Sequence, residues 1–98
     1  MSMAFDSLVD SMREILRRLD ENGFVLPFYI AMIGSDGSSL TGYFYQAEGE
    51  EHLDCKFTSV VGENFTLPVN IMFTDKTGKA ARVVIESPGE PSEPHFFN

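Results

Sequence analysis

The chain is poor in several residue types, and each shortage excludes a class of protein. Only one of its 98 residues is a cysteine, so no disulfide can form within the chain and a reducing compartment is the default. No apolar run approaches the roughly 18 residues that a membrane-spanning helix needs. The first residues lack the basic region of a signal peptide, and acidic side chains interrupt their apolar positions. These shortages predict a cytoplasmic protein that does not interact with membranes.

Basic residues are scarce as well. Seven Lys and Arg stand against 15 Asp and Glu, which gives a formal net charge of -8. Contact with phosphate groups needs clustered Lys and Arg, so we expect neither nucleic acid nor an anionic membrane as a partner. A basic partner protein is compatible with this charge, although acidity also serves simply to keep proteins soluble.

The chemically reactive residue types meet in the stretch GEEHLDCKF, residues 49–57. In an extended strand His52 and Asp54 point to one face and Cys55 to the other, so the H-x-x-C spacing does not converge on a metal ion. Cys55 lies among apolar neighbours and is expected to be a small core residue with an unreactive thiol. No nucleophile-elbow, zincin, EF-hand or Walker pattern occurs elsewhere. We therefore predict no catalytic residue, no metal site and no cofactor, and a protein that is not an enzyme.

The clearest structural signal lies in residues 5–21, which have the spacing of an amphipathic helix. Its apolar positions are Phe5, Leu8, Val9, Met12, Ile15, Leu16 and Leu19. Asn22 and Gly23 then favour a helix end, because both tolerate a positive φ. Glu14 precedes Arg18 by four residues, the favourable order for a surface ion pair.

After Gly23 the apolar period changes to two, which is typical of strands. Strands are expected at residues 24–33, 40–46, 52–61, 65–74 and 79–86, with tight turns around 36–37 and 75–78. The connections are too short for the crossover helices of a parallel sheet. We predict a two-layer α+β domain over residues 1–86, in which one N-terminal amphipathic helix packs on a curved antiparallel five-stranded meander.

Residues 87–98 form a Pro-rich C-terminal tail, with prolines at 88, 91 and 94. This spacing matches the three-residue period of polyproline II. The acidic composition favours a frayed tail, whereas the apolar ending His95-Phe96-Phe97 favours docking on the domain or on a second subunit. The sequence leaves both possibilities open.

Alternation divides the expected strands between two faces. The core face is assigned Phe24, Leu26, Phe28, Ile30, Met32, Leu40, Phe44, Leu53, Cys55, Phe57, Val61, Phe65, Leu67, Val69, Ile71, Phe73, Ala81, Val83 and Ile85. The opposite face is polar in part, but it also carries Tyr29, Ile33, Tyr43, Tyr45 and Met72. Because aromatic residues and Met are enriched at binding surfaces, these five are the candidate binding residues.

A helix of this length, roughly 25 Å by 10 Å, covers about half of a five-stranded sheet about 24 Å across. A curled sheet, the tail or a second chain must cover the rest. We predict a small non-enzymatic binding protein whose partner is a second copy or another protein chain. Two alternatives stay open. One is a module that binds a small apolar ligand in a Phe- and Tyr-lined cleft. The other is an acidic mimic of nucleic acid, whose carboxylates, including Glu48, Glu50, Glu51 and Asp54, gather on one face.

Overall fold

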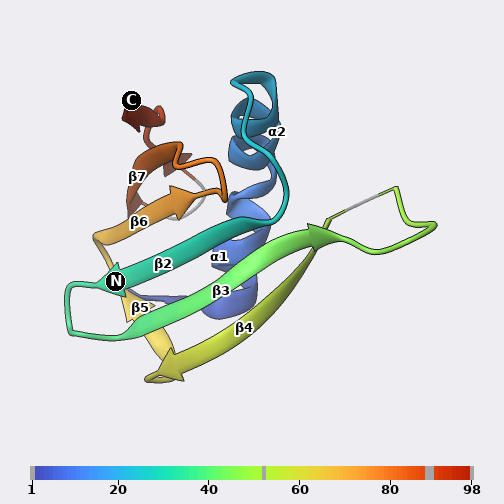
Figure 1. Ribbon diagram of the computed structural model, residues 1–98. Helices are drawn as coiled ribbons and strands as arrows, with labels where there is room; N and C mark the ends of the chain where they lie inside the picture. The colour runs from blue at the N-terminus through green and yellow to red at the C-terminus, as the bar shows by residue number, and fades with distance from the viewer. Residues whose placement is uncertain (1, 52, 88–89, 98) are drawn as a thin grey trace.

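Two short helices lie against one side of a large antiparallel sheet in the computed structural model, which describes residues 2–51, 53–87 and 90–97 (Figure 1). In chain order the elements are β1 (Ser2–Ala4), α1 (Phe5–Ser11), α2 (Arg13–Glu21), β2 (Phe28–Gly34), β3 (Ser39–Gln46), β4 (Leu53–Val61), β5 (Asn64–Thr66), β6 (Val69–Thr74), β7 (Ala80–Ser87), β8 (Glu90–Pro91) and β9 (His95–Phe97). The predicted combination of helix and antiparallel sheet is confirmed. Among the described residues, no helix has the length and apolar composition to cross a bilayer.

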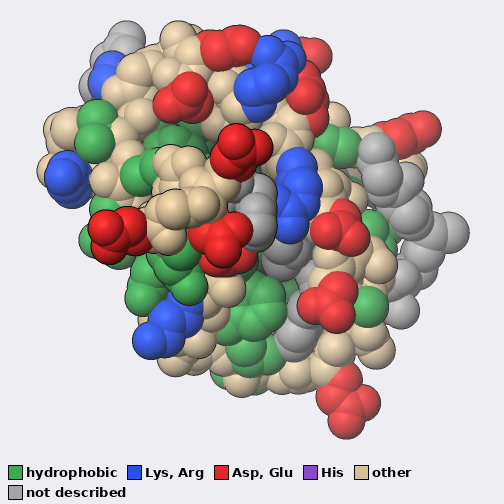
Figure 2. Space-filling model, turned by 90° about the vertical axis from the view of Figure 1, so that its right-hand side faces the viewer, with side chains coloured by type: hydrophobic (Ala, Val, Ile, Leu, Met, Phe, Trp, Pro, Cys, Tyr) green, Lys and Arg blue, Asp and Glu red, His purple; other side chains and the backbone are tan. Residues whose placement is uncertain are grey.

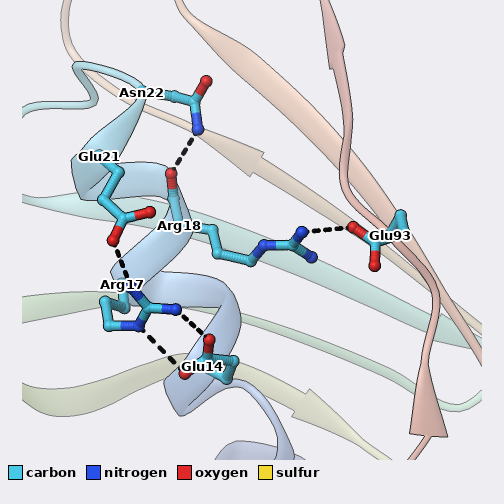
Figure 3. A network of polar contacts seen from close by, with 6 residues as sticks. All are labelled: Glu14, Arg17, Arg18, Glu21, Asn22 and Glu93. Carbon is cyan, nitrogen blue, oxygen red and sulfur yellow. Dashed lines mark hydrogen bonds and ion pairs between the residues drawn. The ribbon is translucent and has the colours of Figure 1, made fainter.

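The predicted helix is divided at Met12 into α1 and α2, although the Leu16 amide still donates to the Met12 carbonyl over 2.8 Å. Its apolar stripe is buried as expected, with Leu8, Met12, Ile15, Leu16 and Leu19 in the core. The helix ends at Asn22, whose side-chain amide donates to the Arg18 carbonyl over 2.7 Å (Figure 3). Burial of this stripe fixes the helices to the inner side of the sheet.

The predicted ion pair between Glu14 and Arg18 is wrong. Glu14 pairs instead with Arg17, which also contacts Glu21, along the exposed side of α2 (Figure 3). Arg18 points away from this network and pairs with Glu93 of the C-terminal segment. The C-terminal segment therefore pairs with Arg18, the residue that helical spacing alone assigns to Glu14.

The predicted five-stranded meander is also wrong. The sheet has the strand order β4-β3-β2-β6-β7, and both β8 and β9 pair with β7, which makes seven strands. After β4 the chain passes through β5, which pairs with β1, and then enters the sheet on the other side of β2. The nearly continuous apolar strand β2 thus occupies the centre, where both of its backbone edges are hydrogen-bonded, and the more polar β4 is left at the edge.

The core lies between the helices and the inward-pointing residues of β2, β3, β6 and β7. It contains Met3, Leu8, Met12, Ile15, Leu16, Leu19, Phe24, Phe28, Ile30, Met32, Leu40, Phe44, Phe65, Val69, Ile71, Phe73, Ala81, Val83 and Ile85. The predicted inward positions of these four strands are confirmed. In β4 the prediction is wrong at Val61, which lies on the outer face and is 56% exposed, whereas Phe57 points inward as predicted but is 36% exposed at the edge of the sheet.

A β-bulge explains this error in β4. Gly42 of β3 lies opposite Phe57, whereas Thr41 lies opposite Ser59, so that Thr58 is an extra residue. Beyond the bulge the alternation is reversed, and Val61 turns to the outer face of the sheet. A Cβ atom on Gly42 would lie only 2.4 Å from the carbonyl oxygen of Lys56, so the close approach of the two strands requires glycine here.

The C-terminal segment packs along β7. Phe96 points to the inner side, where its ring lies 6.0 Å from that of Phe24, and Glu93 pairs with Arg18 of α2. The Ser92 hydroxyl also accepts a hydrogen bond from the Val84 amide over 2.9 Å. These contacts join residues 90–97 to both layers of the fold.

Candidate functional site

The outer face of the sheet, turned away from the helices, is uncharged at its centre. We define it by the outward-pointing residues of β2, β3 and β6, which are Tyr29, Ala31, Ile33, Ser39, Thr41, Tyr43, Tyr45, Asn70, Met72 and Thr74. None of these is charged, although 22% of the residues in the chain are. Charges reappear only in the flanking strands, with Asp54 and Lys56 in β4 and Arg82 and Glu86 in β7.

Three tyrosines form a ladder across β2 and β3. Tyr29 lies directly opposite Tyr43, with ring centroids 6.2 Å apart, and the rings of Tyr43 and Tyr45 are 5.7 Å apart. The rings are tilted against one another, a geometry that aromatic pairs favour. Tyr29 is 45% exposed, whereas Tyr43 and Tyr45 are half-buried. The ladder therefore presents ring edges and phenol groups to solvent on a rigid base.

Apolar side chains continue from this ladder along the outer face. Ile33 is 57% exposed, and Met72 lies next to Ala31 in the centre of the face. The structure thus brings all five predicted binding residues to one face. Val61 lies opposite Ser39 and also belongs to this face, although strict alternation assigns it to the core face. The glycine at position 42, in the middle of a predicted strand, was the available signal for the bulge that turns Val61 outward.

No described helix lies over the outer face. In Figure 1 α1 lies behind β2 and β3 and α2 extends above them, and the buried side chains of both helices belong to the core on the inner side. A contiguous apolar and aromatic surface of this kind is typical of interaction sites in soluble proteins.

A shallow groove of about 590 Å³ borders the outer face beside the C-terminal segment. It is lined by Arg82, Val84, Glu86, Glu90, Ser92, Glu93, His95 and Phe97. Charges of both signs face this groove. In the part of the chain that the structure describes, no group of three His, Cys, Asp or Glu side chains is placed to hold a metal ion.

Two grooves lie on the inner side, between the helices and the β3–β4 hairpin. One, of about 330 Å³, is lined by Arg13, Leu16, Arg17, Asp20, Leu26, Phe28, Gln46, Glu51 and Leu53. The other, of about 310 Å³, is lined by Asp6, Asp10, Arg13, Leu53, Asp54, Cys55 and Phe57. They share Arg13 and Leu53, and their floors are apolar. Their charged walls distinguish them from the mainly apolar pockets that hold small apolar ligands.

Acidic side chains are not gathered into one patch on the side of the molecule shown in Figure 2. They are scattered over this surface, and Lys and Arg side chains lie between them. On this side, the distribution lacks the continuous carboxylate surface that mimicry of a nucleic acid requires.

Cys55 is half-buried in β4 and packs against the core. Burial raises the pKa of its thiol to about 11, while the nearby Arg13 lowers it in part. The thiol is therefore protonated near neutral pH, the form that is a poor nucleophile. His52, the other half of the H-x-x-C pattern, lies outside the described residues.

Asp75 is a buried carboxylate in the turn between β6 and β7, and it was not among the predicted site residues. Its Oδ1 accepts hydrogen bonds from the Thr77 hydroxyl (2.6 Å) and from the amides of Thr77 and Lys79 (2.9 and 3.1 Å), and its Oδ2 accepts one from the Val25 amide (2.7 Å). Burial raises its pKa, but these hydrogen bonds outweigh that effect and lower the pKa to about 2. Asp75 therefore joins the β6–β7 turn to the segment before β2, which is a structural role. An Asp followed two residues later by Thr at a turn was the available signal.

No protein-family model, curated protein or solved structure matches this chain. Its function must therefore be argued from its own surface.

Proposed function

We propose that this chain is a small non-enzymatic interaction protein that associates with a second copy of itself through the outer face of the sheet. The observation that carries the proposal is the absence of charge from the outward positions of β2, β3 and β6 in a chain with a net charge of -8. Depletion of charge together with enrichment in Tyr and Met is the composition of interface centres.

Electrostatics favour this face over others for self-association. Two copies that each carry a charge of -8 repel one another, and most of the molecular surface would bring carboxylates together. Contact through the outer face places uncharged side chains between the copies and keeps the charges of β4 and β7 at the rim. The charges at each rim are of both signs, Asp54 with Lys56 and Arg82 with Glu86.

The size of the outer face sets how much of the rim a dimer contact would include. The three strands that define the outer face, at about 4.8 Å spacing and about 20 Å of length, give a footprint of roughly 290 Å², and adding β4 and β7 raises it to roughly 480 Å² before side-chain relief is counted. A stable interface needs about 800 Å² of accessible surface from each partner. A dimer of standard size would therefore also bury side chains of the mixed-charge rim in β4 and β7.

The test is the solution mass of the chain and of a Tyr43→Lys variant. We expect the natural chain to dimerise at tens of micromolar, and Tyr43→Lys to raise the dissociation constant by about 30-fold or more, because it buries an unpaired charge in the interface. Ser7→Lys is the matched control, since it adds the same charge on the exposed side of α1. A Tyr43→Lys variant that dimerises as well as Ser7→Lys contradicts the proposal.

Salt provides a second test. Raising ionic strength from about 0.05 M to about 0.5 M screens the repulsion between two acidic copies, so dimerisation should become stronger. Dimers that dissociate as salt rises would instead be held together by charge pairs. The proposal places this association in the cytoplasm, and the single protonated thiol is compatible with a reducing compartment.

A further inference from the structure

The strand β4 has an open edge. Among the described residues it pairs with β3 alone, at one end of the sheet order. Its residues from 56 to 61 are exposed, and Phe57 and Val60 are 36% and 43% exposed on the inner side. An edge strand of nine residues that carries exposed apolar side chains is a template to which another strand can add.

The direction of the backbone groups can be followed from two contacts. The Lys56 carbonyl points toward β3, because it is the atom that a Cβ on Gly42 would meet. The Leu53 carbonyl accepts a hydrogen bond from Arg13 of α2 over 3.4 Å, so it points away from β3 and toward the open edge. Since these directions alternate along a strand, the amide and carbonyl groups of Cys55 and Phe57 face the open edge.

A groove with an apolar floor and charged walls lies beside this edge. The side chains of Leu53, Cys55 and Phe57 form its floor, and α1 forms its opposite wall, enclosing about 310 Å³. A strand added to β4 would extend the sheet and place every second side chain over this groove. Backbone pairing and side-chain contact would therefore be available to the same ligand.

The charge of the groove indicates the chemistry of that ligand. The walls contributed by α1 and α2 carry two carboxylates, those of Asp6 and Asp10, and one guanidinium, that of Arg13, so their formal charge is 1 - 2 = -1. Arg13 lies 3.8 Å from Asp10 and is already partly neutralised. A second copy of this chain would bring the same carboxylates to the edge, whereas a basic segment would find charges of opposite sign.

We infer that residues 53–57 of β4 form a docking edge for an extended segment of a different protein, in which basic and apolar residues alternate. Its backbone pairs with Cys55 and Phe57. Its inward Lys or Arg side chains lay their methylene stems on Phe57 and direct their charged ends toward Asp6 and Asp10. This docking edge is separate from the outer face and does not depend on self-association.

The test uses the full chain and two fluorescein-labelled nine-residue peptides, one alternating Lys with Val and one alternating Glu with Val. Fluorescence anisotropy at low salt should show the Lys–Val peptide binding at least about tenfold more tightly than the Glu–Val peptide, and added salt should weaken it. Equal affinity for the two peptides, or no binding of the Lys–Val peptide, overturns the inference.

Variants then locate the site. Cys55→Pro removes an amide that faces the open edge and leaves the pairing with β3 in place, so it should weaken Lys–Val binding about tenfold. Phe57→Ser should weaken it about fivefold, because the apolar floor is reduced. Val61→Ser is the control, because Val61 is a more exposed β4 residue that lies beyond the bulge and on the opposite face.

Should Cys55→Pro fail to fold, the double change Asp6→Asn with Asp10→Asn replaces two exposed carboxylates on α1 and should also reduce binding about fivefold. Unchanged binding in this variant, or an equal loss in Val61→Ser, contradicts the docking edge. The proposed dimer has a different readout, since Tyr43→Lys should alter the solution mass and leave peptide binding unchanged.

Discussion

The two faces of the central strands are alike in lacking charge but differ in what covers them. On the inner face, Phe28, Phe44 and Phe73 are buried beneath the helices, so a charged residue there would lose its hydration. On the outer face, Tyr29, Ile33 and Met72 face solvent, where charge would carry little cost. Folding therefore explains the composition of the inner face but not that of the outer face, and binding is the explanation that we propose for it.

The comparison is tested most severely at two neighbours in β6. Phe73→Ala should destabilise the fold by about 3–5 kcal/mol, because it opens a cavity in the core. Met72→Ala should change the free energy of unfolding by less than about 1 kcal/mol, because its side chain lies outside the core and is 36% exposed. Urea denaturation of dilute protein would measure both. A large loss from Met72→Ala would show that the outer face belongs to a core.

The β-bulge reverses the alternation of side chains along β4. Gly42 allows β3 and β4 to approach closely at this point. Gly42→Ala should cost about 3 kcal/mol, since its Cβ would overlap the Lys56 carbonyl and force β3 and β4 apart. Thr41→Ala loses only an exposed hydrogen bond to Thr58 and should cost about 0.5–1 kcal/mol. Thermal unfolding monitored by circular dichroism would distinguish them. Equal stabilities would mean that the strands are not in close contact at this point.

Much of the architecture could be predicted from the sequence, because it follows from local patterns. The apolar spacing located the helical region, and alternation assigned the inward residues of β2, β3, β6 and β7 correctly. The turn at Asp36-Gly37 is present, with Gly37 at a φ of 90° and the Ser38 amide donating to Asp36 over 3.0 Å. These features depend on neighbouring residues alone.

The features that could not be predicted depend on contacts between distant residues. The order of the strands depends on which strand gains most free energy from a central position in the sheet. The start of the strand predicted at residues 65–74 is β5, which pairs with β1 instead of continuing into the large sheet. Likewise, the bulge turns the Val61 side chain to the outer face, and Arg18 forms its ion pair with Glu93 rather than with Glu14. The five candidate binding residues were placed on one face correctly because β2, β3 and β6 contain no such irregularity.

Asp75 stabilises the fold by joining the β6–β7 turn to the segment before β2. Asp75→Asn should cost about 2 kcal/mol, because it weakens hydrogen bonds made to a charged carboxylate. The folded-state pKa of about 2 lies below the ordinary value of 3.8, so this carboxylate stabilises the fold above about pH 4. That contribution is lost as the pH falls toward 2. Denaturant titrations at pH 7, 4 and 2.5 should show the natural chain losing its advantage over Asp75→Asn as the pH decreases. A constant difference would mean that Asp75 is not held in its charged form.

A small effect on stability is also expected at Tyr43 on the outer face. Tyr43→Lys should change the free energy of unfolding of dilute protein by less than about 1 kcal/mol, because Tyr43 contributes mainly ring contacts with Tyr29 and Tyr45. Its effect on association should be far larger. A variant that is both monomeric and unfolded would place Tyr43 in the folding core and remove the distinction between the two faces.

The central claim is tested most directly by sedimentation velocity of the natural chain at tens of micromolar in low and high salt. Self-association through the outer face should give a species of twice the 11.0 kDa chain mass, with a population that increases as salt rises. A single 11.0 kDa species at every salt concentration, up to high micromolar protein, would contradict it.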